Sequence, residues 1–474
     1  VPDKDEPTYD MICRAETIGV FQIESRAQMS MLPRLKPRDF FDLVIEIAIV
    51  RPGPIQGDMV HPYLQRRQEK EKVEYPSEKL KEVLSSTLGV PLFQEQVMNI
   101  AIVAAGFTPG EADQVRRSMA AWKRSGGLEK FEDKLKKGMK ERKYSDEFAN
   151  RIFEQIKGFG AYGFPQSHSA SFALLTYVSC WLKRHEPAAF CASLLNSQPM
   201  GFYAPAQLVN DARRNGVRFR SVDIAISEWD CTLERGDDGE PELRLGLCMA
   251  GGLSEAEAGK LLQARADAAF DSLEDLANRT NLSRHALAAL AESGALQSLS
   301  GHRHASRWAV AGVQKLDRVL AGSTLAESAI ALPAPTEGQA LVADYRSLGL
   351  TLGRHPLALL RGKLARLRVV TAEKLRDLPN GQTVRVAGIV THRQRPGTAS
   401  GVVFATLEDE TGSANLVIWP KVMEAQRDAI LGSSLMLVEG ELQSAENVIN
   451  IVARRIHNRS EWLGQLQTSS RDFH

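Results

Sequence analysis

Side chains suited to binding anions gather in two stretches of this 474-residue sequence, and the second stretch is built around glycine. Three glycines fall within Gly158–Gly163, which predicts a loop with unusual backbone angles or a close approach to another group. Ser167-His168-Ser169 follows at the start of an apolar run. A glycine loop leading into a serine-capped helix presents backbone N–H groups and a positive dipole end, as phosphate sites do. A tight turn before a buried helix fits equally well, and His168 can be a loop hydrogen-bonder, a phosphate contact or a proton donor.

The first stretch is basic. Four cationic side chains flank the apolar segment Met119–Trp122, namely Arg116, Arg117, Lys123 and Arg124. They cannot all point into bulk water, so an anionic ligand would explain them. Between Gln114 and Lys157 there are 13 Lys and Arg against 7 Asp and Glu, a local excess of +6 in a chain of net charge +1. A solvated helix face accounts for Lys130–Lys143.

The elements that must position these side chains are predicted to be helices. Apolar spacing indicates helices at Phe40–Val50 and Pro91–Phe107, and Thr108–Glu111 starts the helix that carries the arginine pair. Residues 63–84 are charged and predict an exposed helical excursion.

The glycine stretch is expected to lead into a further helix. Ser167 or Ser169 would cap the helix over Ala170–Trp181, and Pro187 would stop it.

Short helices joined by glycine turns follow in the middle of the chain. The expected helices are residues 255–266, one capped near Ser272, and one running from Ser283 to Gly294. Their repetition predicts tandem helix-hairpin-helix units, which hold DNA phosphates without reading sequence, although a plain helical connector also fits.

From Thr383 the apolar period changes to two. Three strands, a helix over Lys421–Ala429 and two more strands make the order of a five-stranded OB barrel. Such barrels bind single strands by stacking and through basic grooves. The barrel is neutral, with 8 Lys and Arg and 8 Asp and Glu over Thr383–Arg459, so single-strand binding would be weak. Residues 392–397 are expected to be a basic loop, and Trp419 is either core or a stacking platform.

The residues expected to bind single strands are arginines on or near this barrel: Arg393, Arg395, Arg454 and Arg455.

Composition narrows the class of protein. The 43% hydrophobic and 25% charged fractions are those of a protein with a real core, and no apolar run predicts a membrane span. The five cysteines show no CxxC and no metal spacing, which predicts reduced cysteines of a cytoplasmic protein. Because the first residue is Val1 rather than Met, we expect a fragment, although an alternative start codon or a processed end also fits.

Five motifs carry a family resemblance: TIGVFQIESRAQM (Thr17–Met29), IVRPGPIQ (Ile49–Gln56), LFQEQVM (Leu92–Met98), ADQVRRSMAAWK (Ala112–Lys123) and GFGAYGFPQSHSASFALLTY (Gly158–Tyr177). In this order they resemble the fingers of bacterial C-family DNA polymerases, the DNA polymerase III alpha subunits.

The resemblance implies a multidomain α+β protein with mostly α-helical fingers, helix-hairpin-helix repeats and a C-terminal five-stranded OB barrel. The expected domains are fingers with the end of the palm connector (1–235), tandem helix-hairpin-helix (236–300), a helical linker (301–382), OB-fold (383–459) and a C-terminal tail (460–474).

Within the family, the sequences of Pro7–Cys13 and Gln22–Met29 are similar to those of the error-prone, damage-inducible branch. The Ser470–His474 ending is similar as well. This branch implies a DNA polymerase of damage-induced mutagenesis and translesion synthesis. A truncated replicative alpha subunit stays the alternative, and a non-catalytic DNA-binding module is the alternative from another class.

Family members hold two Mg²⁺ ions on three palm aspartates. The resemblance implies that this chain starts after the last of them, so no catalytic or metal-binding residue is expected here and the fragment alone should not polymerise. The implied partners are primer-template DNA, deoxynucleoside triphosphates and a Y-family-like adaptor that links to the sliding clamp, with no membrane.

Fingers select the nucleotide, and a triphosphate calls for arginines and preorganised N–H groups. The resemblance implies a nucleotide site formed by Arg116, Arg117, Lys123, Gly160, Tyr162, Gly163, Ser167 and His168. Arg26 and Arg51 would contact template or primer, or pair structurally.

Overall fold

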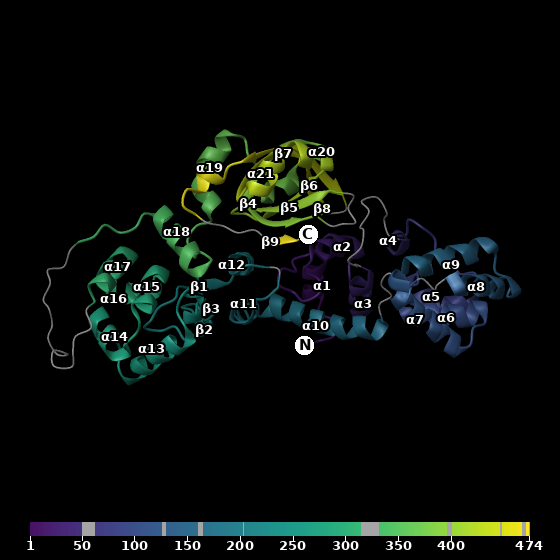
Figure 1. Cartoon of the computed structure of the whole chain (residues 1–474), viewed down its shortest axis with the longest axis horizontal. Helices are drawn as coiled ribbons and strands as arrows, with labels where there is room; N and C mark the ends of the chain where they lie inside the picture. The colour runs from purple at the N-terminus through teal and green to yellow at the C-terminus, as the bar shows by residue number, and fades with distance from the viewer. Residues whose placement is uncertain are drawn as a thin grey trace. The chain divides into compact units, whose positions relative to one another are not determined.

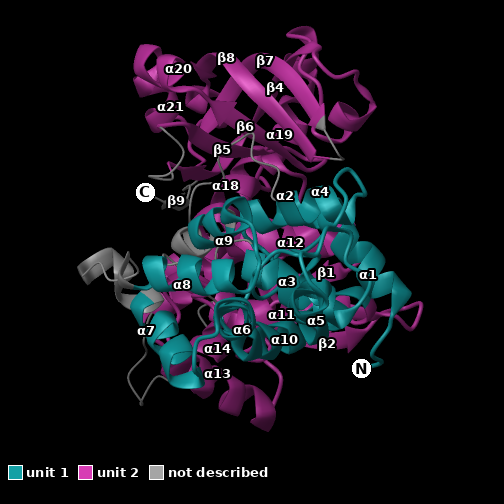
Figure 2. Ribbon diagram, turned by 90° about the vertical axis from the view of Figure 1, so that its right-hand side faces the viewer, with its two compact units in different colours: residues 1–184 teal, residues 185–474 magenta. Residues whose placement is uncertain are grey.

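The structure is a computed structural model of the chain (Figure 1). It describes residues 1–49, 62–125, 129–159, 165–201, 203–313, 331–395, 401–445, 448–466 and 471–473. Within these ranges the side chains of residues 119–125, 129–130, 151, 155–159, 445 and 471–473 are not described. The chain divides into two compact units, residues 1–184 and 185–474 (Figure 2).

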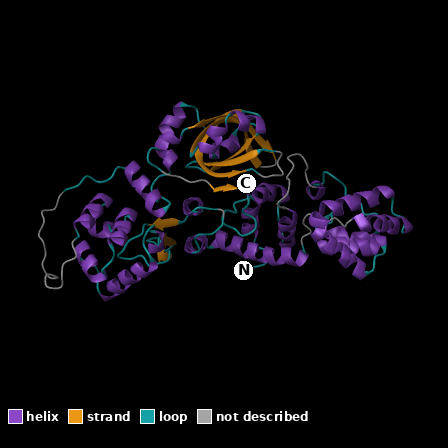
Figure 3. Cartoon of the chain, in the orientation of Figure 1, coloured by secondary structure: helices purple, strands orange, loops and turns teal. Residues whose placement is uncertain are grey.

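In the described part of the first unit, the secondary-structure elements are all helical, and loops join them (Figure 3). These are α1 (Glu6–Cys13), α2 (Arg26–Leu35), α3 (Phe40–Ile49), α4 (Pro62–Arg67), α5 (Glu78–Leu84), the 3₁₀ turn η1 (Ser85–Thr87), α6 (Gln94–Ala105), α7 (Pro109–Ser125), α8 (Glu129–Glu141), α9 (Asp146–Phe159) and α10 (Gln166–His185).

The helices begin and end where local chemistry directs. Ser25 and Gln28 form a capping box at the start of α2, and Gly106 ends α6 in the left-handed region with φ of 73°. The helices α5, α6, α8 and α9 bury one apolar core that includes Ile100, Met139 and Phe153. The helices expected within Phe40–Val50 and Pro91–Phe107 and after Thr108 are present.

Two expectations about this unit were wrong. The stretch 63–84 is not simply exposed, because Tyr63 and Leu64 in α4 and Leu80 in α5 are fully buried. Ser167 and Ser169 do not cap α10, because that helix already begins at Gln166 and both serines lie inside its first turns.

The second unit combines helices with two sheets, which Figure 3 shows in orange. Its elements are α11 (Pro187–Asn196), α12 (Pro205–Arg214), β1 (Arg218–Arg220), β2 (Thr232–Arg235), β3 (Pro241–Arg244), η2 (Leu247–Met249), α13 (Glu255–Asp267), α14 (Leu273–Thr280), α15 (Arg284–Ser293), α16 (Gln297–Ser300), α17 (Arg303–Gly312), α18 (Glu337–Leu348), α19 (Pro356–Arg366), η4 (Glu373–Asp377), β4 (Thr383–Gln394), β5 (Val403–Glu408), β6 (Ser413–Ile418), α20 (Pro420–Ala425), α21 (Arg427–Gly432), β7 (Leu435–Ala445), β8 (Val448–Asn458), η5 (Ser460–Leu463) and β9 (Arg471–Phe473).

The helix-hairpin-helix region follows the expected pattern. Ser254, Ser272 and Ser283 each accept a backbone N–H at the start of α13, α14 and α15, and Gly294 ends α15 with φ of 82°. The three helices lie where the sequence predicts them.

The C-terminal strands close into a barrel. The strand order is β5-β6-β8-β7-β4, and β4 also pairs with β5, so the five strands form a ring. Its interior is apolar and includes Leu416, Met436 and Ile451. β9 adds a parallel strand beside β4. The predicted fold class, helical fingers followed by helix-hairpin-helix and a five-stranded OB barrel, is confirmed. The domain boundaries proposed from the sequence stay predictions.

Candidate nucleotide and nucleic-acid interface

The arginine pair lies on α7 and is held by one carboxylate. Asp113 accepts a hydrogen bond from Nε of Arg116 at 2.9 Å and from Nε of Arg117 at 2.8 Å. The spacings are i, i+3 and i, i+4, which place the three side chains on one helix face. The hydrogen bond from Arg116 lowers the pKa of Asp113. The arrangement aims two adjacent guanidinium groups outward from one helix.

The two arginines differ in exposure. The Arg117 side chain is 74% exposed and that of Arg116 is 39% exposed. An exposed ion pair is worth little, so either guanidinium can exchange Asp113 for an anion of higher charge. Two adjacent guanidinium groups held in this way form a fork, which suits bidentate contact with a pair of phosphate oxygens.

The predicted histidine and serine lie at the first turn of α10. Ser167 and His168 are exposed there, and the His168 ring lies 4.1 Å from the Phe172 ring. The Ser167 carbonyl accepts a hydrogen bond from the Ser171 hydroxyl at 2.9 Å.

A carboxylate already meets this helix end, a contact that the sequence reading missed. Oε2 of Glu95, in the first turn of α6, accepts the backbone N–H of Gln166 at 3.0 Å. An anion is favourable at a helix N-terminus, so Glu95 takes part of the role expected for a phosphate. α6 also packs against α7. α6 therefore contacts both the arginine helix and the start of α10.

Side chains of α10 form hydrogen bonds with backbone carbonyls of the N-terminal residues. Lys183 is buried and donates to the Ile18 carbonyl at 2.7 Å, and Thr176 donates to the Phe21 carbonyl at 3.0 Å. The Tyr177 hydroxyl donates to the Pro2 carbonyl at 2.7 Å. The sequence does not single out Lys183, because a long-range contact leaves no local signal.

Several predicted residues fall outside what the structure describes. Gly160, Tyr162, Gly163 and Arg51 lie outside the described residues, and the side chain of Lys123 is not described. Their proposed roles stay predictions.

Arg26 is the first residue of α2 and is half-buried. Burial lowers its pKa to about 10, which leaves the guanidinium charged at neutral pH. Both roles expected for it, template contact and structural pairing, stay open.

The barrel arginines separate into a buried and an exposed group. β4 continues to Gln394, so the basic loop expected at 392–397 is wrong for its first three residues. Arg393 is therefore a strand residue. It is 7% exposed and donates to the Ile430 carbonyl at 2.9 Å and to the Ser433 carbonyl. Its guanidinium ties α21 to the barrel, which is a structural role.

The remaining three arginines are exposed. β7 and β8 shift register where Gly440 faces Ala453 and Glu439 faces Arg455, so Arg454 is the extra residue of a bulge. A bulge places consecutive side chains toward one side, which explains why Arg454 and Arg455 are both exposed. Arg454 pairs with Glu441 at 2.5 Å. Arg395 lies just after the end of β4.

An aromatic side chain joins this set. Trp419 is 53% exposed at the start of α20, so it is not a core residue. Gly401 lies close to both Arg395 and Pro420, the neighbour of Trp419, since a Cβ there would lie 3.8 Å from Nη2 of Arg395 and 3.5 Å from Cγ of Pro420. An exposed indole near an arginine suits a nucleobase.

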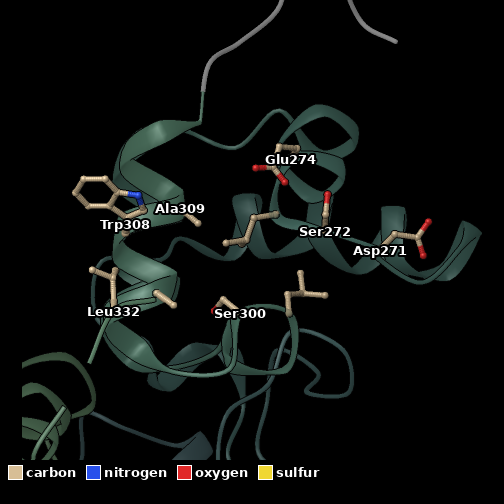
Figure 4. A pocket seen from close by; sticks show the side chains of 10 residues that line it. Asp271, Ser272, Glu274, Ser300, Trp308, Ala309 and Leu332 are labelled. Atoms are coloured by element: carbon tan, nitrogen blue, oxygen red, sulfur yellow. The ribbon is translucent and has the colours of Figure 1, made fainter. Parts of the chain in front are cut away.

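A pocket of about 290 Å³ lies in the helix-hairpin-helix region (Figure 4). Trp308 and Leu332 line one side, and Asp271, Ser272 and Glu274 line the other. The two carboxylates repel phosphate, so this pocket does not suit a nucleotide.

Metal chemistry needs a cluster of ligands. Within the described ranges no group of three or more His, Cys, Asp or Glu side chains could hold a metal ion. In the same part of the chain no helix is long and apolar enough to cross a membrane.

Three domain families match separate parts of the chain. The bacterial DNA polymerase III alpha subunit finger domain matches residues 1–143, a helix-hairpin-helix motif matches residues 216–306, and an OB-fold nucleic acid binding domain matches residues 384–458.

Whole-chain relatives are similar throughout. The chain is 58% identical over 474 residues to an error-prone DNA polymerase of Alkalilimnicola ehrlichii and 56% identical over 475 residues to that of Pseudomonas aeruginosa. A Pseudomonas fluorescens relative of the same name is 57% identical over 484 residues. Each match covers 100% of this chain but 46–47% of the relative, so the chain spans about half their length. The resemblance expected from the sequence is confirmed, and a truncated replicative subunit is not favoured.

Proposed function

Because the chain belongs to the bacterial C-family DNA polymerases, we propose that it works in error-prone, DNA-directed DNA synthesis, with its fingers holding the incoming nucleotide. The observation that carries this proposal is the fork on α7, where Asp113 holds two outward-facing arginines. A triphosphate is a stronger anion than one carboxylate and can draw both guanidinium groups from Asp113. The process it serves is DNA repair by damage-induced mutagenesis and translesion synthesis.

The other half of the nucleotide site is proposed at the start of α10. Ser167 and His168 would contact the phosphates there, together with Gly160, Tyr162 and Gly163. The Glu95 carboxylate bonded to Gln166 must then share or yield this helix end when the nucleotide binds. Lys123 is a further proposed phosphate contact, and Arg26 and Arg51 are proposed to contact template or primer or to pair structurally.

Bond formation is proposed to depend on residues of the palm rather than of the fingers. Polymerases of this class use two Mg²⁺ ions to align the attacking oxygen and the α-phosphate. The described residues include no cluster of three or more His, Cys, Asp or Glu side chains that could hold such ions. We place the ions on palm aspartates outside these 474 residues and expect no polymerisation by the chain alone.

The helix-hairpin-helix and OB modules are proposed to bind the DNA. Exposed Arg395, Arg454, Arg455 and Trp419 would meet a single strand, while Arg393 is engaged inside the barrel. The remaining proposals are an adaptor that links to the sliding clamp and a cytoplasmic location.

The test is Arg117→Ala in the full-length polymerase. Loss of a charge-assisted contact should raise the apparent nucleotide KM. It should also lower kcat/KM by a factor that corresponds to about 1.5–3 kcal/mol of transition-state stabilisation. Lys140→Ala is the matched control, because Lys140 is also 74% exposed and its ion pair is with an exposed aspartate on the next helix, Asp146. Single-turnover nucleotide incorporation that is unchanged in the Arg117 variant would overturn the assignment.

A further inference from the structure

Two cysteines meet where the helix-hairpin-helix region begins. Cys231 precedes β2, and Cys248 lies in η2. The two segments run side by side, since the Leu247 N–H donates to the Glu228 carbonyl at 2.8 Å and the Cys248 N–H donates to the Trp229 carbonyl at 2.9 Å. Backbone hydrogen bonds therefore join the segment before β2, residues 228–231, to the segment after β3, residues 246–248, at the base of the β2–β3 hairpin.

Gly246 permits this close approach. A Cβ at Gly246 would lie 2.3 Å from the Asp230 carbonyl carbon and 2.4 Å from the Trp229 carbonyl oxygen. The Gly246 N–H donates to Sγ of Cys231 at 3.4 Å. Any larger residue would push the two segments, and with them the two thiols, apart.

The surrounding frame fixes both segments. The Ser227 hydroxyl donates to the Leu245 carbonyl at 2.8 Å. Arg265 on α13 donates to the Ile224 carbonyl at 3.0 Å and to the Ser227 carbonyl at 2.7 Å. This network holds the backbone next to the two segments that carry the thiols.

The thiols also alter each other's acidity. A hydrogen bond between the two side chains lowers the pKa of Cys231 and raises the pKa of Cys248. The Gly246 N–H, which also donates to the Cys231 sulfur, acts on the pKa of Cys231 in the same direction. A thiolate is the reactive form of cysteine. Cys231 is 4% exposed, while Cys248 is partly open to solvent.

We propose that Cys231 and Cys248 form a reversible oxidation site, at which a peroxide joins the two sulfurs in a disulfide that fastens residues 228–231 to residues 246–248. The bond would close the hairpin at the base of the helix-hairpin-helix region and constrain its unfolded state. A thiol reductant would reverse it by exchange.

The chemistry balances with hydrogen peroxide as the oxidant. One thiolate attacks the peroxide, an S–O bond forms, the O–O bond breaks, and hydroxide leaves as water after taking a proton. The second sulfur then attacks the sulfenic sulfur, the S–S bond forms, the S–O bond breaks, and a second water leaves with the second thiol proton. Two thiols are oxidised and one peroxide is reduced to two waters.

The other cysteines make this pairing specific. Cys191 also lies near Cys231, but its thiol is directed at the Leu208 carbonyl at 3.9 Å. Cys180 is fully buried, and burial raises the pKa of Cys13. Cys13 is partly open to solvent, which makes it the matched control for simple accessibility.

The test treats the 474-residue chain with limiting hydrogen peroxide, alkylates the remaining thiols and maps peptides without reduction. We expect one Cys231–Cys248 linked peptide, with loss of two hydrogen atoms from the intact mass and recovery of both thiols after dithiothreitol. Cys248→Ser should abolish the linked peptide, and Cys13→Ser should leave it unchanged. The wild-type mapping needs no variant, so the result does not depend on whether a cysteine variant folds.

Two results would overturn the proposal. One is a Cys191–Cys231 linkage in place of the expected one. The other is separate oxidation of Cys231 and Cys248 to sulfinic acids, at the rate of Cys13 and with no linkage.

Discussion

At the scale of single residues, Glu46 on α3 lies in an environment that does not suit a charge. It is 0% exposed, and neither carboxylate oxygen has a hydrogen-bond partner in the part of the chain that the structure describes. α3 is buried around its whole circumference from Asp42 to Ala48. Desolvation therefore raises the pKa of Glu46 well above its ordinary value.

This predicts a stability that falls as pH rises. The folded state holds the Glu46 proton more tightly than the unfolded state, so the favourable contribution is complete below the unfolded pKa of about 4.3 and is lost as pH rises toward the folded pKa. Within that window the unfolding free energy should fall by up to about 1.4 kcal/mol per pH unit. Glu46→Gln should remove this slope in urea denaturation between pH 5 and 8.

Glu82→Gln serves as the control, because Glu82 is exposed on α5. Its slope should match the original chain. Parallel curves for the Glu46 variant and the original chain would contradict the prediction.

Arg393 is a second case in which burial decides the role of a charged side chain. Its guanidinium donates to the carbonyls of Ile430 in α21 and of Ser433 just after it, so Arg393→Ala removes the donor of both bonds. We expect a loss of about 2–4 kcal/mol in unfolding free energy, measured by urea denaturation. Exposed Arg395→Ala should change it by less than about 0.5 kcal/mol. Equal losses in the two variants would refute the structural role.

At the level of elements, the start of α20 presents an indole outward. Trp419 is 53% exposed there, and its neighbour Pro420 and Arg395 both lie close to Gly401. If a nucleobase stacks on it, Trp419→Ala should weaken single-stranded DNA binding by about 1–3 kcal/mol. Trp308→Ala is the matched control, because Trp308 is 57% exposed but faces a pocket with two carboxylates.

Fluorescence titration with an oligothymidine would measure both variants. If Trp308→Ala weakens binding and Trp419→Ala does not, the single strand binds elsewhere.

Across the whole molecule, charge is nearly balanced, with 59 Lys and Arg against 58 Asp and Glu. Strong nonspecific DNA binding is therefore not expected from net charge, and local arginines must supply the phosphate contacts. For single strands, log Kobs falls against log salt concentration with a slope of about −0.7 per phosphate neutralised.

Replacing Arg454 and Arg455 by alanine should make that slope less steep by about 1.4, measured by anisotropy between low and moderate salt. The same double change at Lys137 and Lys140 on α8, which we interpret as a solvated helix face, should leave the slope unchanged. An unaltered slope in the arginine variant would remove these residues from the proposed DNA surface.

The sequence by itself determined the succession of helices, the helix-hairpin-helix region, the barrel order and the family. Each depends on local signals, such as the serine caps at Ser254 and Ser283 or the period of two after Thr383, and on motifs with a fixed order. Local chemistry is sufficient there because caps, turns and strand alternation act between near neighbours.

Only the tertiary structure decided which partners the charged and thiol side chains have. It showed Arg393 buried inside the barrel, Glu95 on the Gln166 N–H, Lys183 on the Ile18 carbonyl and Cys231 beside Cys248. These contacts join residues from 17 to 165 positions apart in the chain, and a side chain's partner at such a separation depends on how elements pack. Neither propensity nor periodicity carries that information.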